Sequence, residues 1–430
     1  MFQKIKALAG QSVIYGIGQV ATRAASFLLL PAYTYWLPVA DYGALTLYYS
    51  FIAVAQVIYL YGIDVSLMRY YIPLKEKTQR NELFSTVLVL SFFSSTLISA
   101  LLWLLRAPLA SSILEEGAAP VILLFCLVVL WLDTFSALPF VVLRAKQKAF
   151  HYTSLRMLSV LLNLGANFWL VGHLHRGLQG VLEANILSSA ITMIPLLWII
   201  RKDISFKFNW KILPPVLKFG LPNIPHLFFV MVLELSSRKF LEYYSSAEQT
   251  GLYGVGAKLG MIFSILAMAF RNAWAPFFLE EGEKPDSPNL FARVLTYFLL
   301  VFGILFLFLT YYIPPIMKMP IPGFSMPLIE PKYWGGIEIF PIILLGQVFN
   351  GVAANLSAGF FLRNRIHIQA YISGVASAAS VLFNIWLIPV SVFGQRRGAS
   401  LSGMAVLPSA SGYMPEKIIR YPMRGNDCSI

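Results

Sequence analysis

Charged residues are scarce in this chain, and their scarcity excludes most classes of soluble protein. Asp, Glu, Lys and Arg make up 12% of its 430 residues, whereas hydrophobic residues make up 58%. Soluble domains have roughly a quarter of their residues charged. A disordered chain is excluded as well, because disorder needs low hydrophobicity and a high density of charge. The composition therefore predicts a protein that lies mostly in lipid.

Two other features are missing. The chain has only two cysteines, Cys126 and Cys428, which excludes a disulfide framework. It has no G-x-x-x-x-G-K-[ST] phosphate-binding loop, so ATP-driven transport by this chain alone is not expected. The net charge of +13 would point to nucleic acid in a soluble protein. In a membrane protein it orients the helices, and we expect no nucleic-acid partner.

Long apolar runs are what the chain has instead. A spanning helix needs about 20 mostly apolar residues, and open strands are not tolerated in hydrocarbon. The fold class predicted is therefore an all-α, polytopic membrane protein with about eleven spans. The predicted spans are residues 12–36, 44–68, 83–105, 119–143, 153–172, 178–200, 214–236, 254–274, 291–313, 338–362 and 367–389.

Basic residues alternate between the two sides of these spans. With the N-terminus in the cytoplasm, about twenty Lys and Arg side chains fall on the cytoplasmic side and about eight on the outer side. Cytoplasmic loops carry the excess of basic residues in multi-pass proteins. The sequence thus predicts a cytoplasmic N-terminus.

The chain also resembles itself at an offset of about 208 residues. Tyr35 then falls on Tyr243 and Gly43 on Gly251, each pair between two long spans. Two similar halves around a site at the membrane midplane are a recurring transporter plan. We predict an N-terminal six-helix lobe at 1–210, a C-terminal lobe of about five helices at 211–395 and an atypical tail at 396–430.

Ionisable residues inside the predicted spans are the best candidates for function. Each costs roughly 2.5–3.5 kcal/mol at the centre of a helix on insertion scales, so it needs a partner, water or a ligand. Arg23 lies near the middle of the first span, on a polar stripe with Gln19. The stripe either lines a wet cavity, or Arg23 joins two helices by pairing with a carboxylate.

Further cations point to an anionic ligand. A cavity that holds Arg23, Lys258, Arg238 and Lys239 would attract an anion, and phosphate is the obvious one. Glu234 is spaced from Arg238 for an ion pair within the helix, which is an alternative interpretation of both residues.

Carboxylates inside the spans have two open roles. The residues are Asp64, Asp133 and Glu234. They either neutralise the cations when the site is empty or carry a coupling proton or sodium ion. The sequence leaves both roles open.

Several segments, in order along the chain, resemble one known family. They are GQSVIYGIGQVATRAASFLLLPAYTYWLPVADYGALTLYYSF from residue 10, KFGLPNIPHLFF from residue 218, GLYGVGAKLG from residue 251 and FNIWLIPVSVFG from residue 383. Together they make the chain resemble the polysaccharide-biosynthesis flippases, which export O-antigen and capsule and belong to the multidrug/oligosaccharidyl-lipid/polysaccharide superfamily. The resemblance covers roughly residues 8–395.

The resemblance implies two six-helix lobes around a central and often cationic cavity. Family members usually have twelve to fourteen spans, and for this chain we predict 11–12. It implies a flippase of the bacterial cytoplasmic membrane, which moves an undecaprenyl-diphosphate-linked oligosaccharide to the outer leaflet by alternating access. Arg23, Lys258 and Arg271 would hold the diphosphate, with Arg238 and Gln19 as further cavity residues. The implied partners are the lipid-linked oligosaccharide, membrane lipids, a polysaccharide polymerase and glycosyltransferases. No cofactor is expected besides a coupling H⁺ or Na⁺.

The C-terminal tail departs from this family. After Gly394 no further run of 20 apolar residues follows, and Pro408, Pro415 and Pro422 interrupt the segment. The tail is interpreted as truncated, frame-shifted or strongly diverged, and this places the activity of the product in doubt.

Two other functions are weighed against the flippase. One is a cation-coupled multidrug exporter of the same architecture, which would rely on Asp64 or Asp133. The other is a membrane glycosyltransferase or polymerase, which needs catalytic groups on a substantial outer loop. The outer loops are short and poor in acids, so we expect a protein that is not an enzyme.

Overall fold

The computed structural model describes residues 27–106, 120–205, 208–281, 286–320, 326–356 and 366–395, and these residues are helical with no strand. Residues 27–36 form a helix. The other long helices are α2 (Val39–Leu60), α4 (Lys77–Leu104), α6 (Pro120–Ala145), α7 (Ala149–Asn167), α8 (Gly177–Ile200), α10 (Ile224–Tyr244), α11 (Ala247–Glu281), α12 (Ser287–Lys318), α13 (Trp334–Leu356) and α15 (Ile366–Gln395). Shorter helices are α3 (Ile63–Tyr71) and α9 (Leu213–Gly220).

Within the described residues, nine helices are long and apolar enough to cross a membrane. Each overlaps one of the predicted spans, which confirms the all-α, polytopic membrane fold. A tenth predicted span, 214–236, coincides with α9 and α10, where charged residues such as Glu234 and Arg238 lower the hydropathy. The 3₁₀ turn Leu221–Asn223, which contains Pro222, separates these two helices, and Pro225 follows at the start of α10. The first predicted span, 12–36, is described only from residue 27.

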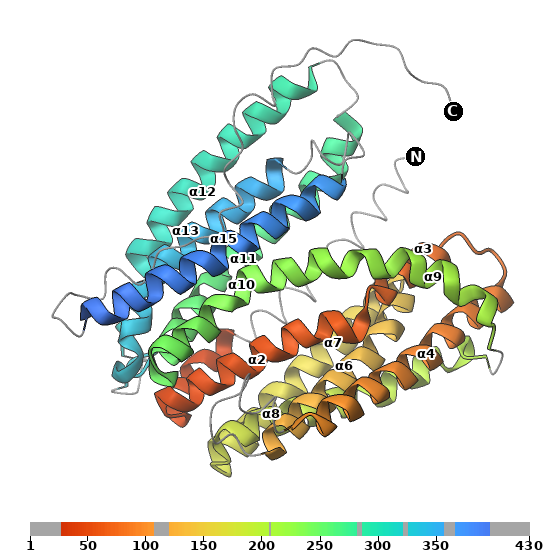
Figure 1. Ribbon diagram of the computed structural model, residues 1–430, viewed down its shortest axis with the longest axis horizontal. Coiled ribbons are helices and arrows are strands. Elements are labelled where there is room, and N and C mark those ends of the chain that lie inside the picture. Colours follow the sequence, from red (N-terminus) through yellow and green to blue (C-terminus); the bar gives the residue numbers. More distant parts are fainter. Residues whose placement is uncertain are drawn as a thin grey trace.

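The helices form two groups (Figure 1). Helices α2, α4, α6, α7 and α8 pack on one another and form the first group. In the second group, α10 packs on α15, whereas α11 and α12 both pack on α13. Helix α2 joins the groups through its contacts with α11 and α10. The groups lie close together where α2 and α11 begin and diverge toward the opposite end (Figure 1). We call that opposite end, which carries α3 and the C-terminus of α6, the basic end.

The second span is shorter than predicted. A single helix over 44–68 was wrong, because α2 ends at Leu60 and α3 begins at Ile63. Tyr61 and Gly62 adopt positive φ angles of 33° and 73°. Gly62 also meets the backbone of Gly220 at the end of α9, where a side chain would clash with the Gly220 carbonyl oxygen. Glycine tolerates both the left-handed backbone and this close approach.

The contact between α2 and α11 is twofold symmetric. A Cβ atom on Gly43 would clash with the carbonyl oxygen of Ala247, and one on Gly251 would clash with the carbonyl oxygen of Val39. Val39 and Ala247 are separated by 208 residues, and so are Gly43 and Gly251. The offset seen in the sequence therefore relates the two helices in space. We call this contact, through Gly43, Thr46, Gly251 and Gly254, the seam.

Helix α11 uses its other face for α13. A Cβ on Gly256 would clash with the carbonyl oxygen of Gly336, and Gly260 lies against Ile343. Lipid tails are as apolar as leucine, so spanning helices associate through close packing of small residues rather than through the hydrophobic effect. The glycines of GLYGVGAKLG thus allow α11 to pack tightly on two neighbours at once.

The seam gives a first prediction. Gly43→Ala forces the backbones of α2 and α11 apart, and such overpacking costs about 1–3 kcal/mol. We expect the midpoint of thermal unfolding, measured in detergent by tryptophan fluorescence, to fall by several degrees. Gly303→Ala on α12 is the control, because no heavy atom lies within 4 Å of its added Cβ. An equal change in both variants would contradict the role of the seam.

Candidate functional site

Two cations lie together where α2, α10 and α11 meet. Arg238 on α10 donates from Nη1 to Ser50 Oγ on α2 at 3.0 Å. Its charge acts on Lys258 of α11, and also on Tyr42 and Tyr253. The Arg238 Nε atom is buried and has no hydrogen-bond partner in the described part of the chain. The structure thus brings Arg238 and Lys258 together, as the sequence suggested.

The position of this pair follows from the seam. Ser50 lies two turns beyond Gly43 on α2, and Lys258 lies two turns beyond Gly251 on α11. Ser50 and Lys258 are themselves separated by 208 residues, so they occupy equivalent places in the two halves. The Nε atom of Arg238 lacks an acceptor although Nη1 has one, and an anion with several oxygens can accept from both Arg238 and Lys258. Chemically, the pair is suited to hold a phosphate.

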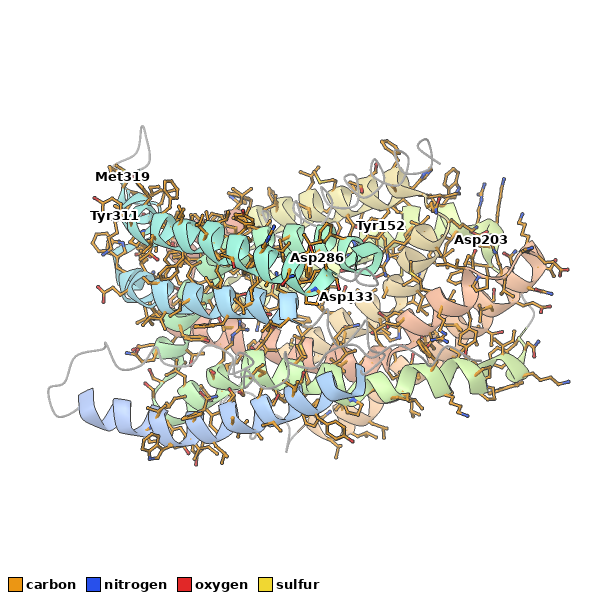
Figure 2. The ribbon with its side chains drawn as sticks, turned by 90° about the horizontal axis from the view of Figure 1, so that it is seen from above. Asp133, Tyr152, Asp203, Asp286, Tyr311 and Met319 are labelled. Carbon is orange, nitrogen blue, oxygen red and sulfur yellow. The ribbon has the colours of Figure 1, made fainter. Side chains whose placement is uncertain are left out.

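Asp133 lies on α6, within the first group of helices. Figure 2 shows it part-way along the molecule, between Asp203 at one end and Tyr311 and Met319 at the other. Its Oδ1 atom accepts a hydrogen bond from Ser189 Oγ at 3.1 Å. The carboxylate is therefore held between α6 and α8 by a neutral donor.

The first group of helices also contains a network of uncharged polar side chains that was not predicted from the sequence. Tyr33 donates to Asn167 Oδ1 at 2.7 Å, and Asn167 donates to Asn163 Oδ1 at 3.2 Å. Asn163 in turn donates to Asn185 Oδ1 at 3.2 Å, and Asn185 donates to the Tyr49 hydroxyl at 2.7 Å. The network joins α2, α7, α8 and the helix at 27–36. Asn163 and Asn167, four residues apart in an apolar run, were the signal for it.

The other two predicted carboxylates do not join Asp133. Asp64 lies on α3 at the basic end, in a separate cavity with Arg69 and Arg144. Glu234 is exposed on α10. Arg238 makes its described hydrogen bond to Ser50 on another helix. The three candidate carboxylates therefore lie in different parts of the molecule, each beside different neighbours.

Three predicted residues cannot be placed. Gln19, Arg23 and the side chain of Arg271 lie outside the described residues. Lys239 forms an ion pair with Glu242 at 2.6 Å on the same helix.

Hydrogen bonds across the two halves close the molecule at the seam end. The Tyr333 hydroxyl lies 3.0 Å from the carbonyl oxygens of both Leu37 and Pro38, to which it can donate. The Tyr35 hydroxyl donates to the carbonyl oxygen of Pro327, and the Glu330 amide donates to Thr34 Oγ1 at 3.4 Å. The segment before α2 is thus tied to the segment before α13.

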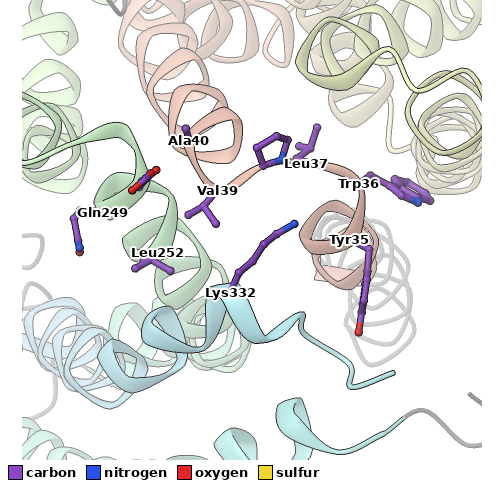
Figure 3. A pocket seen from close by; sticks show the side chains of 10 residues that line it. Tyr35, Trp36, Leu37, Val39, Ala40, Gln249, Leu252 and Lys332 are labelled. Atoms are coloured by element: carbon purple, nitrogen blue, oxygen red, sulfur yellow. The ribbon is translucent and has the colours of Figure 1, made fainter. Parts of the chain in front are cut away.

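A cavity of about 640 Å³ lies at this end, beside the seam. It is lined by the first residues of α2 and α11 and by Lys332 of the 3₁₀ turn η5 (Pro331–Tyr333). In Figure 3 the Lys332 side chain extends toward the start of α2, whereas Trp36 points away. Trp36 packs edge-on against Phe168, with ring centroids 5.0 Å apart.

Comparison with known proteins identifies the family. The model of the family described as "Polysaccharide biosynthesis protein" matches residues 8–280. The chain belongs to this family. It is 24% identical over 275 residues to protein 1 of the Lsg locus of Haemophilus influenzae, and 22% identical over 286 residues to an uncharacterized membrane protein of the same organism. These matches span 63% and 64% of this chain, but only 65% and 66% of the two relatives.

The fold is shared with a larger group of transporters. An inward-facing structure of a multidrug resistance MATE family transporter of the MOP superfamily matches with a TM-score of 0.67. The match covers 90% of this chain and 89% of that protein at 13% sequence identity. At this identity the likeness establishes the fold alone. The chain is thus a multi-pass membrane protein that shares the fold of this transporter.

The closed end gives a second prediction. Tyr333→Phe removes a hydrogen-bond donor that holds the halves together, worth about 0.5–1.5 kcal/mol. The reporter is the thiol of an Ala257→Cys variant, one turn beyond Gly254, in a background with Cys126→Ser and Cys428→Ser. We expect an impermeant maleimide added at the seam side to react roughly threefold to tenfold faster when Tyr333 is replaced.

Tyr311→Phe is the matched control for this experiment. Tyr311 lies toward the same end (Figure 2) and is 74% exposed. Equal labelling rates in the Tyr333→Phe and Tyr311→Phe backgrounds would show that the Tyr333 hydroxyl does not hold this end closed.

Proposed function

We propose that this protein is a flippase that moves an undecaprenyl-diphosphate-linked oligosaccharide across the bacterial cytoplasmic membrane for cell-surface polysaccharide biosynthesis. Membership of the polysaccharide biosynthesis family supports the pathway. The observation that carries the substrate class is the pair Arg238 and Lys258, with the buried and unpartnered Nε of Arg238. Arg23, Arg271 and Gln19 are proposed to complete the binding site.

The chemistry of this site suits a diphosphate. A guanidinium offers a planar fork of donors, and an ammonium offers a compact point charge, so together they can contact several phosphate oxygens. Two neighbouring cations repel each other strongly in a medium of low dielectric constant. An entering diphosphate relieves that repulsion, whereas a cationic drug would add to it.

Alternating access follows from the two helix groups. We propose that the lobes at 1–210 and 211–395 rock about the seam and that the basic end faces the cytoplasm, with the N-terminus on the same side. In the described arrangement the seam end is closed by the Tyr333 and Tyr35 hydrogen bonds. The substrate would then enter between the lobes from the basic end and leave when the seam end opens.

The transport cycle also needs a coupling ion and partner proteins. A proton or a sodium ion is proposed to couple transport through Asp133, which lies in the first lobe beside the polar network. Asp64 and Glu234 are the alternative coupling sites. Membrane lipids surround the protein, and a polysaccharide polymerase and glycosyltransferases are the proposed partners in the same pathway.

The binding site gives a third prediction. In a deletion strain that expresses the variants, Arg238→Gln and Lys258→Gln should each lower surface polysaccharide roughly 10- to 100-fold, because a charge-assisted hydrogen bond contributes about 1.5–3 kcal/mol. Arg23→Ala should have a similar effect. Immunoblots of membranes should show unchanged amounts of protein. Arg238→Lys keeps the charge but loses the fork, so its export should be intermediate.

Arg293→Gln is the control for these variants, because Arg293 is exposed near the start of α12. Normal export from Arg238→Gln and Lys258→Gln at normal abundance would reject the diphosphate site. If, in addition, deletion of the gene made the cells sensitive to cationic drugs, the multidrug exporter would be the better function.

The coupling site gives a fourth prediction. Asp133→Asn cannot exchange a proton or hold a sodium ion by charge, so export should be low and should no longer respond to collapse of the ion gradient. The measurement is surface polysaccharide with and without a protonophore, repeated at low sodium. Asp286→Asn is the control, since Asp286 is an exposed residue that accepts from Asn289 at 2.8 Å. If collapse of the gradient lowered export by the same factor in the wild type and in Asp133→Asn, the coupling ion would bind at another residue.

A further inference from the structure

A second cavity lies at the basic end, far from the seam. Its volume is about 520 Å³, and it is lined by residues of α3, the segment that follows it and the C-terminal part of α6. The residues are Asp64, Val65, Met68, Arg69, Ile72, Pro73 and Arg144. It exists because α2 stops at Leu60 and α3 restarts after the left-handed turn at Gly62. Of its residues the flippase mechanism proposed above uses only Asp64, as an alternative coupling site, and it uses neither arginine.

Two guanidinium groups give this cavity its charge. The Arg69 guanidinium stacks over the Phe219 ring, with its Cζ atom 4.1 Å from the ring centroid. Stacking fixes the group while its N–H edge remains able to donate. The Arg144 Nε atom is buried and has no hydrogen-bond partner in the part of the chain described. A buried guanidinium nitrogen without an acceptor has an N–H that a ligand oxygen can satisfy.

One carboxylate faces these two cations. Asp64 lines the same cavity but forms no ion pair with either arginine among the described residues. A nearby acid at this end, Asp203, is already paired with Lys146. The cavity therefore retains a net charge of one positive unit and is able to hold a singly charged anion.

The rest of the cavity is apolar and continues onto the surface. Val65 is 46% exposed and Ile72 is 52% exposed. Both flank the arginines at the basic end, where the spanning helices finish and basic residues collect. Apolar surface next to a cationic pocket, at the end of the spanning helices, matches a lipid, with its tails along Val65 and Ile72 and its phosphate at Arg69 and Arg144.

We propose that this cavity binds an anionic phospholipid through its phosphate group. The ligand chemistry is a phosphodiester with one negative charge and two acyl chains, held by Arg69 and Arg144 at the boundary of the membrane. Bound lipid would fill the notch between α3 and α6 and supply the acceptor that Arg144 Nε lacks. The site is independent of the transported substrate.

Lipid titration of the purified full-length chain tests this. The protein in detergent is titrated with dioctanoyl phosphatidylglycerol, dioctanoyl phosphatidylcholine or inorganic phosphate, and the midpoint of thermal unfolding is recorded. A ligand that binds only the folded state raises this midpoint as its concentration exceeds the Kd. We expect phosphatidylglycerol to raise the midpoint, with a much smaller effect of phosphatidylcholine and none of phosphate.

The variants locate the effect. Arg144→Gln should weaken the apparent affinity for phosphatidylglycerol roughly tenfold, because it removes a charge-assisted contact. Arg69→Gln should weaken this affinity to a similar extent. Because Arg69 is exposed, this variant tests the cavity even if Arg144→Gln does not fold. Arg201→Gln is the matched control, since Arg201 is also at the basic end but stacks on Trp198 at 4.7 Å, outside the cavity.

Three results would overturn the proposal. An unchanged affinity in both Arg144→Gln and Arg69→Gln would exclude this cavity as the site. Equal stabilisation by phosphatidylcholine would exclude recognition of negative charge. Stabilisation by inorganic phosphate alone would make this a free-phosphate site. Because none of these measurements uses transport, their failure leaves the flippase proposal untouched, and loss of that function leaves this one untouched.

Discussion

The close contact of α2 and α11 is the constraint on which the rest of this structure depends. In lipid, apolar side chains gain little by leaving one apolar neighbour for another, so helices must approach closely to associate. Gly43 and Gly251 permit that approach, since each lies against a backbone carbonyl of the opposite helix. The contact fixes the distance between the two halves and the places of Ser50 and Lys258. It also brings α10, which carries Arg238, beside α2, and it leaves Tyr333, just before α13, within hydrogen-bond distance of the segment that leads into α2.

Much of the fold was predictable because the lipid imposes simple rules. A minimum length of apolar helix and the absence of strands follow from the thickness and dryness of the bilayer. The spans over α4, α6 and α12 could therefore be drawn from hydropathy. The break between α2 and α3 could not, because the apolar run continues through Tyr61 and Gly62 without a change in composition. That break depends on the approach of Gly220, which is distant in the sequence.

The candidate site was predictable only where charge was involved. Arg238 and Lys258 are conspicuous in apolar runs, and the structure places them together. Asp64 and Glu234 are equally conspicuous but face other surroundings, because the direction in which a helix turns a side chain depends on its neighbours. The asparagines at 163, 167 and 185 were missed for another reason. Single neutral amides in an apolar run do not mark a site in a hydropathy plot. Once buried, however, they need hydrogen-bond partners.

The twofold seam also has a consequence for how such a molecule could arise. Helices that meet through equivalent residues are what a half-length ancestor would use to pair with a second copy of itself. In such a homodimer every central cation would appear twice, and the repulsion in a low dielectric medium would rise accordingly. In this single chain one copy of the position has serine and the other has lysine. A single chain therefore allows the charge at the centre to be set one residue at a time, independently of the backbone symmetry around it.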